Sequence, residues 1–416
     1  MEKLQDKKWV NYLLSAWIFI PAFLYFRIVD RYAVNIPWSD DYDAILGFLL
    51  QFRNAPFSEK IGLLFLQHNE HRILPSRLVY ITWQALFGRI NFRYLTFIGD
   101  TQLLVAFFIS IYFIRRCIPR YWSIAAFVWG LCLFDLNTYE NSGVTMTSMQ
   151  NNGVVMFFFI SLFFYSLNRR IYLIPAIVFQ FLCMFASGNG IIGSIFIAAF
   201  AFFTRDRPKI IGSGVTLLVF SCLYFWNYVA PQHATVPKTL SHQIAFFLQM
   251  SGAHFSVEYA LWFAVLIIAV LLLTLPLRDR GKIEAPLLPV ISILGFVVAT
   301  IAAAAVFRSN VTDTIFYGSK YMIYPNLLAA ISFFFLFRKI LPTRWLWPVT
   351  AICIIGMLYT YRLNYLQGRG NFASENYKLT TRSYYYPDST KAKRITDDAC
   401  KAGLYCRPDE PGPAVR

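Results

Sequence analysis

Apolar stretches of about 20 residues, long enough to cross a bilayer, recur along this chain of 416 residues. Hydrophobic residues make up 57% of the chain and charged residues only 14%. A water-soluble domain of this composition would expose large apolar patches, so a soluble globular enzyme is excluded. We expect an all-α polytopic membrane protein with about eleven transmembrane helices, at 10–30, 94–114, 121–135, 153–167, 171–187, 190–204, 210–230, 257–277, 286–306, 321–337 and 345–362.

Basic residues cluster at every second connection between these stretches. The connections between the clusters are almost free of Lys and Arg, and the clusters lie at 3–8, 115–120, 169–170, 205–209, 278–282 and 338–344. Because cytoplasmic loops of membrane proteins are enriched in Lys and Arg, the alternation predicts a cytoplasmic N-terminus. The formal net charge of +16 therefore indicates membrane topology, and we expect no nucleic-acid partner.

The first external loop is predicted at residues 31–93. The first two basic clusters are both cytoplasmic only if two crossings separate them. The apolar stretch at 73–88, which is interrupted by Pro75 and Arg77, is therefore predicted to be an interfacial helix. The loop also contains an amphipathic stretch, 44–52, which we expect to lie flat on the bilayer.

The polar tail at 363–416 follows a transmembrane domain at 1–362. With eleven crossings the tail is external and the C-terminus is periplasmic. Cys400 and Cys406 look like a pair, and an oxidising compartment would let them form a disulfide. The tail either covers an acceptor channel, where its tyrosine cluster stacks on sugar rings, or is a disordered segment held by that disulfide.

Two adjacent acids, Asp40 and Asp41, stand near the start of the first loop. One interpretation is structural: Ser39 caps the helix that follows, and the two carboxylates stabilise its first turn. The other interpretation is catalytic, because adjacent carboxylates raise each other's pKa and one of them can act as a general base.

A second polar group in the same loop consists of five consecutive residues, His68 to Arg72. On a helix His68, His71 and Arg72 would share one face, which suits a phosphate or sugar hydroxyls, and Glu70 would hold one imidazole in position. The alternatives are an ordinary solvated turn, or a metal site in which the two histidines join a carboxylate.

The connection at 136–152 is rich in amides and contains no base. Amides bind sugar hydroxyls as donors and as acceptors, so Glu140, Asn141 and Gln150 are candidate sugar ligands. Glu140 is alternatively a simple solvated acid. In the connection at 307–320, Arg308 and Lys320 are candidates for a lipid phosphate, or they anchor helix ends at the level of the headgroups.

This layout resembles the GT-C superfamily of membrane glycosyltransferases. The residues that carry the resemblance are Asp40-Asp41, in the position of the superfamily's first-loop acidic pair, and the segment 72–89, which contains Pro75 and ends in Phe87-Gly88-Arg89. The segment lacks the double proline of many members, which argues against the aminoarabinose and protein-mannosyl branches. In size, span count and external tail the chain is more similar to the serotype-converting O-antigen glucosyltransferases of bacteria.

The resemblance implies an inverting transfer of a hexose, such as glucose, from a polyprenyl-phosphate carrier. The acceptor would be an envelope polysaccharide or a lipid-linked saccharide, as in O-antigen or lipopolysaccharide modification, on the periplasmic face of the bacterial inner membrane. Asp40 would be the base, with Asp41 as its partner or the alternative base, and the phosphate would be bound by some of His71, Arg72, Arg308 and Lys320. Expected partners are these two substrates and membrane lipids. No cofactor is expected, although a divalent metal is an option.

Two other classes remain open. A transporter or flippase of a lipid-linked saccharide would place ionisable groups within the membrane, where Asp100 and Asp135 are the candidates. An internal repeat, which is common in transporters, is not found in the sequence. A membrane acyltransferase would use a histidine base near midmembrane or on the cytoplasmic side, whereas the predicted topology places His68 and His71 outside.

Overall fold

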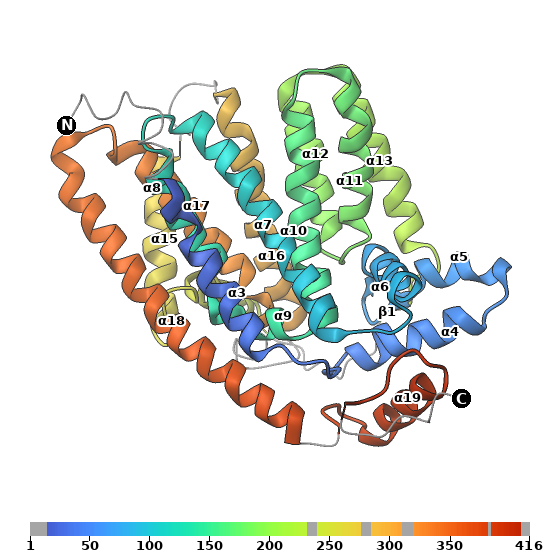
Figure 1. Cartoon of the computed structure of the whole chain (residues 1–416). Helices are drawn as coiled ribbons and strands as arrows, with labels where there is room; N and C mark the ends of the chain where they lie inside the picture. The colour runs from blue at the N-terminus through green and yellow to red at the C-terminus, as the bar shows by residue number, and fades with distance from the viewer. Residues whose placement is uncertain (1–14, 231–238, 276–283, 310–318, 382–383, 409–416) are drawn as a thin grey trace. The chain divides into compact units, whose positions relative to one another are not determined.

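A computed structural model of the chain describes residues 15–230, 239–275, 284–309, 319–381 and 384–408. Five helices within these ranges are long and apolar enough to cross a membrane: α7 (Phe92–Cys117), α13 (Arg207–Phe225), Ala285–Arg308, Ser319–Ile340 and α18 (Trp347–Thr381). Shorter apolar helices occupy Arg170–Met184, Gly190–Thr204 and Ala260–Thr274. The chain is thus a helical protein with the features of a membrane protein (Figure 1). The count of eleven crossings and their orientation stay predictions.

The chain divides into two compact units. Unit 1 comprises 1–28, 104–138 and 233–368, and unit 2 comprises 29–103, 139–232 and 369–416. Three helices contribute residues to both units: α3 (Ile20–Tyr32), α7 (Phe92–Cys117) and α18 (Trp347–Thr381).

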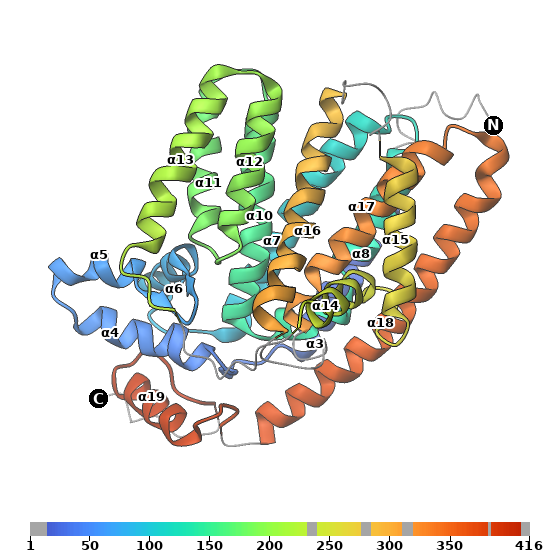
Figure 2. The same cartoon turned by 180° about the vertical axis from the view of Figure 1, so that it is seen from behind.

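In unit 1, α17 packs against α8, α15 and α16, and these helices can be followed in Figure 2. The elements of this unit are η1 (Ala16–Phe19), α8 (Trp122–Leu133), η3 (Leu136–Thr138), α14 (Leu240–Gly252), α15 (Ala260–Thr274), η5 (Ala285–Leu287), α16 (Leu288–Arg308), η6 (Ser319–Tyr321), α17 (Ile323–Ile340) and η7 (Arg344–Leu346).

Unit 2 combines a group of apolar helices, α10 to α13, with the helices of the first loop and the tail. Its elements are η2 (Tyr42–Gly47, a π-helical turn), α4 (Phe48–Asn54), α5 (Phe57–Phe65), β1 (Gln67–His68), β2 (His71–Arg72), α6 (Leu74–Phe87), α9 (Tyr139–Gly143), α10 (Thr145–Ser166), η4 (Arg170–Tyr172), α11 (Leu173–Met184), α12 (Gly190–Thr204), α13 (Arg207–Phe225) and α19 (Ser389–Lys401).

Helix α6 is the predicted helix at 73–88, and its local sequence explains both ends. Pro75 lies in the first turn, where its fixed φ angle is favourable and its missing N–H is not needed. Gly88 ends the helix with φ of +75°, a conformation that glycine adopts at little cost. The proline that interrupts the apolar stretch therefore marks the start of a helix.

The structure corrects two predicted segments in unit 2. Residues 67–72 form a two-stranded hairpin, with His68 opposite His71, so the predicted helical face of His68, His71 and Arg72 does not exist. Asn69 takes φ of +48° in the turn, which asparagine tolerates better than most residues. The predicted connection at 136–152 is largely helical, since α9 and the first turns of α10 occupy it.

The tail also begins differently from the prediction. Helix α18 runs through residue 363 to Thr381, and no proline interrupts the chain between Pro348 and Pro387. Gly368 permits a close approach, because a Cβ atom there would lie 2.4 Å from the carbonyl oxygen of Leu136. The predicted disulfide between Cys400 and Cys406 is confirmed.

Gln180 links the apolar helices of unit 2. Its buried amide accepts a hydrogen bond from Tyr165 of α10 and donates to Ser194 of α12 and to the carbonyl oxygen of Ser213 in α13, at 2.9, 2.7 and 3.0 Å. Lipid tails are as apolar as these helices, so the hydrophobic effect does not drive the helices together within a bilayer. Interhelical hydrogen bonds help to hold them together instead.

We predict that Gln180→Leu lowers the stability of the detergent-solubilised protein by about 2 kcal/mol, because it removes three such bonds. Thermal unfolding followed by circular dichroism measures the change. Gln51→Leu, at an exposed position of α4, serves as the control. An equal melting temperature for the two variants would contradict the assigned role.

Candidate functional site

Asp41 anchors the first loop to the start of α10 in unit 2. Its side chain is buried, and its two oxygens accept backbone N–H groups from Met146, at 2.7 Å, and from Trp38, at 3.1 Å. Met146 belongs to the first turn of α10, where N–H groups lack partners within the helix and favour negative charge. Burial raises the pKa of Asp41 to about 7, because the loss of hydration outweighs these hydrogen bonds, and the charge of Asp40 adds to the rise.

Asp40 has a different environment from its neighbour. Its side chain is only partly buried, so it keeps access to solvent. Its backbone oxygen accepts the N–H of Ala44, which starts the helical turn η2. Asp41, and not Ser39, is the N-cap residue of η2, and Ser39 takes φ of +52°. The structure therefore separates the acidic pair into a buried anchor, Asp41, and an accessible carboxylate, Asp40.

His68 lies in the electrostatic field of these acids. Burial lowers the pKa of His68, Asp40 and Asp43 partly offset that effect, and Arg77 reinforces it. Within the part of the chain that the structure describes, the buried Nε2 atom of His68 has no hydrogen-bond partner. A neutral imidazole with an unpaired ring nitrogen can donate or accept one more hydrogen bond, depending on its tautomer.

Arg77 is a site residue that the sequence analysis treated only as an interruption of an apolar stretch. It is buried in α6, and its Nη1 atom donates to the carbonyl oxygens of Leu63, Leu64 and Leu66 at the end of α5. Burial lowers the pKa of Arg77 to about 10, which leaves the group charged at neutral pH. Its Nε atom is buried without a partner among the described residues, so a charged donor remains available.

Ser76, Arg77 and Tyr80 occupy the buried side of α6, at spacings of one and four residues. Tyr80 is electrostatically coupled to Asp41 and to Arg77. The helical spacing of these three polar residues in the first half of a mainly apolar helix was the sequence signal for this side of the site.

His71 and Glu70 form the predicted pair. The Nδ1 atom of His71 accepts the backbone N–H of Gly188 at 3.0 Å, so the proton of the neutral imidazole lies on Nε2. That nitrogen lies 3.6 Å from a carboxylate oxygen of Glu70. Glu70 thus lies beside this imidazole, and His71 holds the first loop against the turn that precedes α12.

The guanidinium group of Arg72 donates hydrogen bonds to backbone carbonyl oxygens. Its Nε donates to the carbonyl oxygen of Tyr224 at 2.6 Å, and its terminal nitrogens donate to those of Phe65 and Trp226. The side chain is buried and lies over the ring of Tyr224. These contacts tie the hairpin to the ends of α5 and α13 and give Arg72 a structural role, while phosphate binding by Arg72 stays a prediction.

The amides predicted to bind sugar form an internal network. Asn141 donates to Asn152 at 2.6 Å and accepts from Asn151 at 3.2 Å, and Asn152 in turn donates to Asp100. Gln150 donates to the hydroxyl of Ser187 at 3.0 Å. Asn141 and Gln150 are buried. Their bonds join α7, α9 and α10 and the turn before α12, and sugar binding by Asn141 and Gln150 stays a prediction.

The remaining predicted residues are placed as follows. Glu140 lies in the first turn of α9 and is partly buried. Arg308 and Lys320 belong to unit 1, where their charged groups lie 5.8 and 5.5 Å from the centre of the Tyr321 ring. In the described ranges no three His, Cys, Asp or Glu side chains come together as a candidate metal site.

We predict that the stability of the protein falls as the pH rises from about 4 to about 7, in part because of Asp41. In the unfolded chain Asp41 ionises near its ordinary value of 3.8, whereas in the folded chain it keeps its proton up to about pH 7. The folded state thus binds more protons in this window, and its advantage is lost as the pH rises. The melting temperature of Asp41→Asn should depend less on pH than that of the wild type.

The exposed residue Asp398 provides the control for this measurement. Thermal unfolding of the wild type, Asp41→Asn and Asp398→Asn is compared between pH 4.5 and 7.5. A slope in Asp41→Asn that equals those of the other two proteins would disprove the assignment.

We predict that Arg72→Gln lowers stability by at least about 3 kcal/mol, since buried carbonyl oxygens lose a charged donor. Arg72→Lys should not restore it, because an ammonium group cannot reach three carbonyls as a planar guanidinium does. Denaturation of the purified variants tests this, with the exposed Arg89→Gln as control. If Arg72→Gln is as stable as Arg89→Gln, the structural role is wrong.

No protein-family model matches this chain, and no curated protein is significantly similar to it. Function is therefore inferred from the residues of the chain itself and from their contacts.

Proposed function

We propose that the protein is a membrane glycosyltransferase that transfers a hexose from a polyprenyl-phosphate carrier to an envelope polysaccharide or a lipid-linked acceptor, with inversion at the anomeric carbon. The proposal places the reaction on the periplasmic face of a bacterial inner membrane. The observation that carries it is the pairing of an accessible carboxylate, Asp40, with a buried neighbour, Asp41, that is anchored by two backbone N–H groups.

Asp40 acts as the general base in this proposal. Attack on the anomeric carbon requires removal of the proton from the acceptor hydroxyl, and a carboxylate with access to substrate can take it. Asp41 is a positioning residue, because both of its oxygens accept backbone N–H groups and its burial favours the protonated form. This division replaces the choice that the sequence left open between the two acids.

The leaving phosphate needs donors that stabilise its developing charge. Arg72 is committed to carbonyl oxygens, and His71 binds Gly188, so neither is the strongest candidate. Arg77 keeps an unpaired Nε donor and a full charge, and His68 keeps an unpaired ring nitrogen. We therefore assign the phosphate to Arg77 and His68, while Arg308 and Lys320 stay candidates from the sequence for the carrier lipid.

The test is transfer of radiolabelled hexose in proteoliposomes that contain purified protein, a polyprenyl-phosphate hexose and a lipid-linked acceptor. We expect Asp40→Asn to lower the rate of transfer by roughly 10²- to 10⁴-fold, the usual contribution of a general base. The control is Asp398→Asn, an exposed acid on the tail, which should keep the wild-type rate.

Two results would contradict the base assignment. One is a rate for Asp40→Asn close to that of the wild type. The other is an equal loss in Asp40→Asn and Asp398→Asn. Mass spectrometry of the envelope polysaccharide from cells with and without the protein tests the activity itself, since a hexose-sized increment should depend on Asp40.

A second candidate function, transport of a lipid-linked saccharide, is favoured by a buried polar cluster in unit 1. Asp135 and His254 have fully buried side chains, with 3.8 Å between carboxylate and imidazole. Asn137 and His254 both contact Asn326, and Asn364 donates to Asp135 at 2.9 Å. Buried ionisable pairs in membrane proteins commonly carry protons or contact transported substrates. Redistribution of the lipid-linked sugar across the bilayer that is lost in Asp135→Asn, without hexose transfer, would favour this function.

A further inference from the structure

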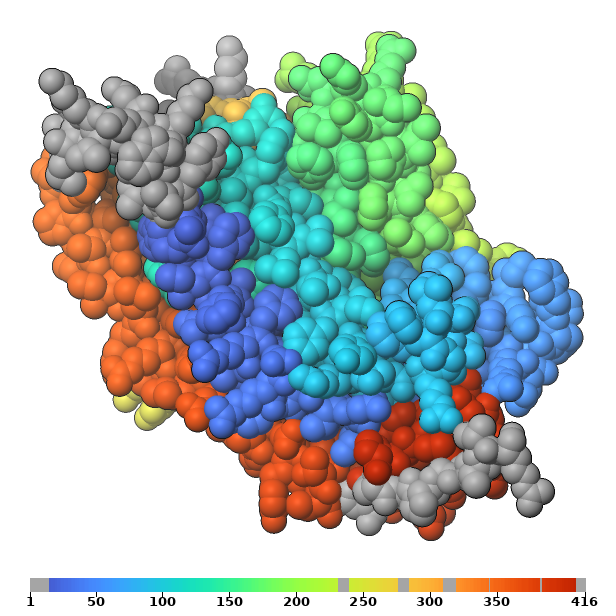
Figure 3. All heavy atoms as spheres, in the orientation of Figure 1, coloured from blue at the N-terminus to red at the C-terminus, as the bar shows by residue number. Residues whose placement is uncertain are grey.

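The tail of the chain is packed on the first loop. The buried side of α19 consists of Ala392, Ile395, Thr396 and Ala399, and its three apolar members join a hydrophobic cluster with Tyr42 and Ile45. In Figure 3 the red atoms of the tail lie directly against the blue atoms of the first loop. Asp388 starts α19 by accepting the N–H of Lys391 at 2.9 Å. Residues 384–408 of the tail are therefore a folded part of unit 2.

A polar contact fixes the tail beside the acidic pair. Asp43, two residues after Asp41, accepts hydrogen bonds from the hydroxyl of Tyr386 and from Lys391 Nζ, the latter at 2.8 Å. The ring of Tyr386 contacts that of Tyr42. Lys391 also acts electrostatically on His68. The tail thus places a positive charge close to a segment that carries three acids within four residues.

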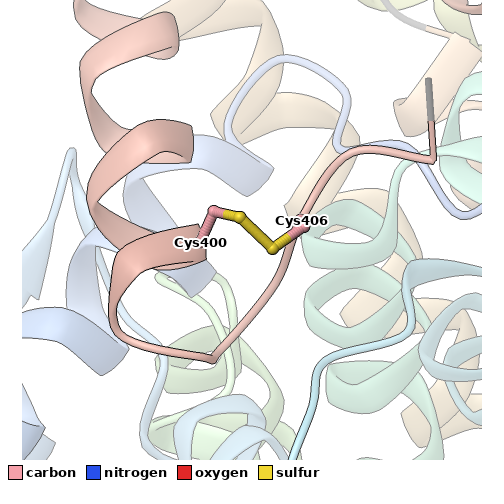
Figure 4. Close-up of a disulfide and its surroundings, with 2 residues drawn as sticks. All are labelled: Cys400 and Cys406. Carbon is pink, nitrogen blue, oxygen red and sulfur yellow. A yellow bond between two sulfur atoms is a disulfide. The ribbon is translucent and has the colours of Figure 1, made fainter. Parts of the chain in front are cut away.

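The disulfide closes a short loop that holds the end of the tail on the same surface. Cys400 lies in the last turn of α19 and is bonded to Cys406 across the turn that follows the helix (Figure 4). Inside this loop, the carbonyl oxygen of Leu404 accepts the N–H of Ile90 at 2.8 Å, and the hydroxyl of Tyr405 donates to the carbonyl oxygen of Asn35 at 2.9 Å. The cross-link and these contacts lie in one stretch of seven residues.

We propose that the tail is an intramolecular cover of the candidate site, that Lys391 is a positioning residue of that site, and that the Cys400–Cys406 disulfide controls whether the cover is docked. Reduction by a dithiol adds two electrons and two protons to the S–S bond, gives two thiols, and oxidises the dithiol to its own disulfide. The released loop loses the constraint that presents Leu404 and Tyr405 to the first loop. The effect on catalysis rests on the proposed function, whereas the docking does not.

Docking is tested without any substrate, by hydrogen–deuterium exchange of the purified full-length protein. We expect dithiothreitol to speed exchange in residues 42–49 and 389–405 by roughly tenfold, as removal of a cross-link implies. Cys400→Ser/Cys406→Ser should exchange at the faster rate without the reductant. Cys222→Ser, which removes an exposed free thiol, is the control and should respond to the reductant like the wild type.

The role of Lys391 is tested by hexose transfer in Lys391→Gln. Lys401→Gln, on the same helix but with a largely exposed side chain, is the matched control. We expect a loss of about fivefold in Lys391→Gln, the upper range for a partly exposed ion pair, and none in the control.

A purely structural residue would not shift the pH profile, so this profile is the second measurement. Loss of the cation raises the pKa of nearby acids, and the acidic limb of the profile of Lys391→Gln should therefore move to higher pH. The titratable and charged groups around Lys391 and the acidic segment are Asp40, Asp41, Tyr42, Asp43, His68, Arg77, Tyr386 and Arg407.

The outcomes separate this proposal from the proposed function. Unchanged exchange after reduction would overturn the disulfide-controlled docking, whether or not transfer is observed. Transfer that occurs in the wild type and is unaffected by Lys391→Gln would overturn the role of Lys391. If the wild type transfers no hexose but exchange responds to reduction, the proposed function fails while the docked cover stands.

Discussion

Burial of one carboxylate organises the part of unit 2 that contains the candidate site. Asp41 gives up hydration in order to accept N–H groups from Trp38 and from Met146 in the first turn of α10. Neither N–H group has an acceptor within a helix. For Met146 the carboxylate supplies the acceptor that the first N–H groups of every helix lack. The loop is thereby held against an apolar helix, and Asp40, His68 and Asp43 acquire defined positions around this point.

Charged residues in this loop serve the backbone as much as any ligand. The ends of α5 and α13 leave carbonyl oxygens without partners within a helix, and Arg72 and Arg77 donate to them. A guanidinium suits this task because its planar group donates in several directions at once. The two arginines differ in their unpaired donors, since the Nε atom of Arg77 has no partner among the described residues. Counting the bonds already made separates structural arginines from candidate ligands.

Features with a local physical cause could be predicted from the sequence. Apolar length identified the five long apolar helices that the described residues contain, and the position of Cys400 and Cys406 outside the apolar stretches identified them as a pair. The hairpin at 67–72 could not be predicted, because His68, His71 and Arg72 also fit a helical spacing and their partners come from distant helices. Asn141 and Gln150 were predicted to bind sugar, and their hydrogen-bond partners within the protein are visible only in three dimensions. The acidic pair was located, but its division into anchor and accessible acid depends on Met146, about a hundred residues later.

Helix α18 has a consequence for how this chain can vary in length. Its 35 residues extend about 50 Å at 1.5 Å per residue, whereas the hydrocarbon core of a bilayer is about 30 Å thick. If α18 crosses a bilayer, part of the helix therefore continues beyond the lipid, even when the helix is tilted. Each residue added or removed within it would turn everything that follows by about 100°. The length of this helix should thus differ between related chains by about whole helical turns, or not at all.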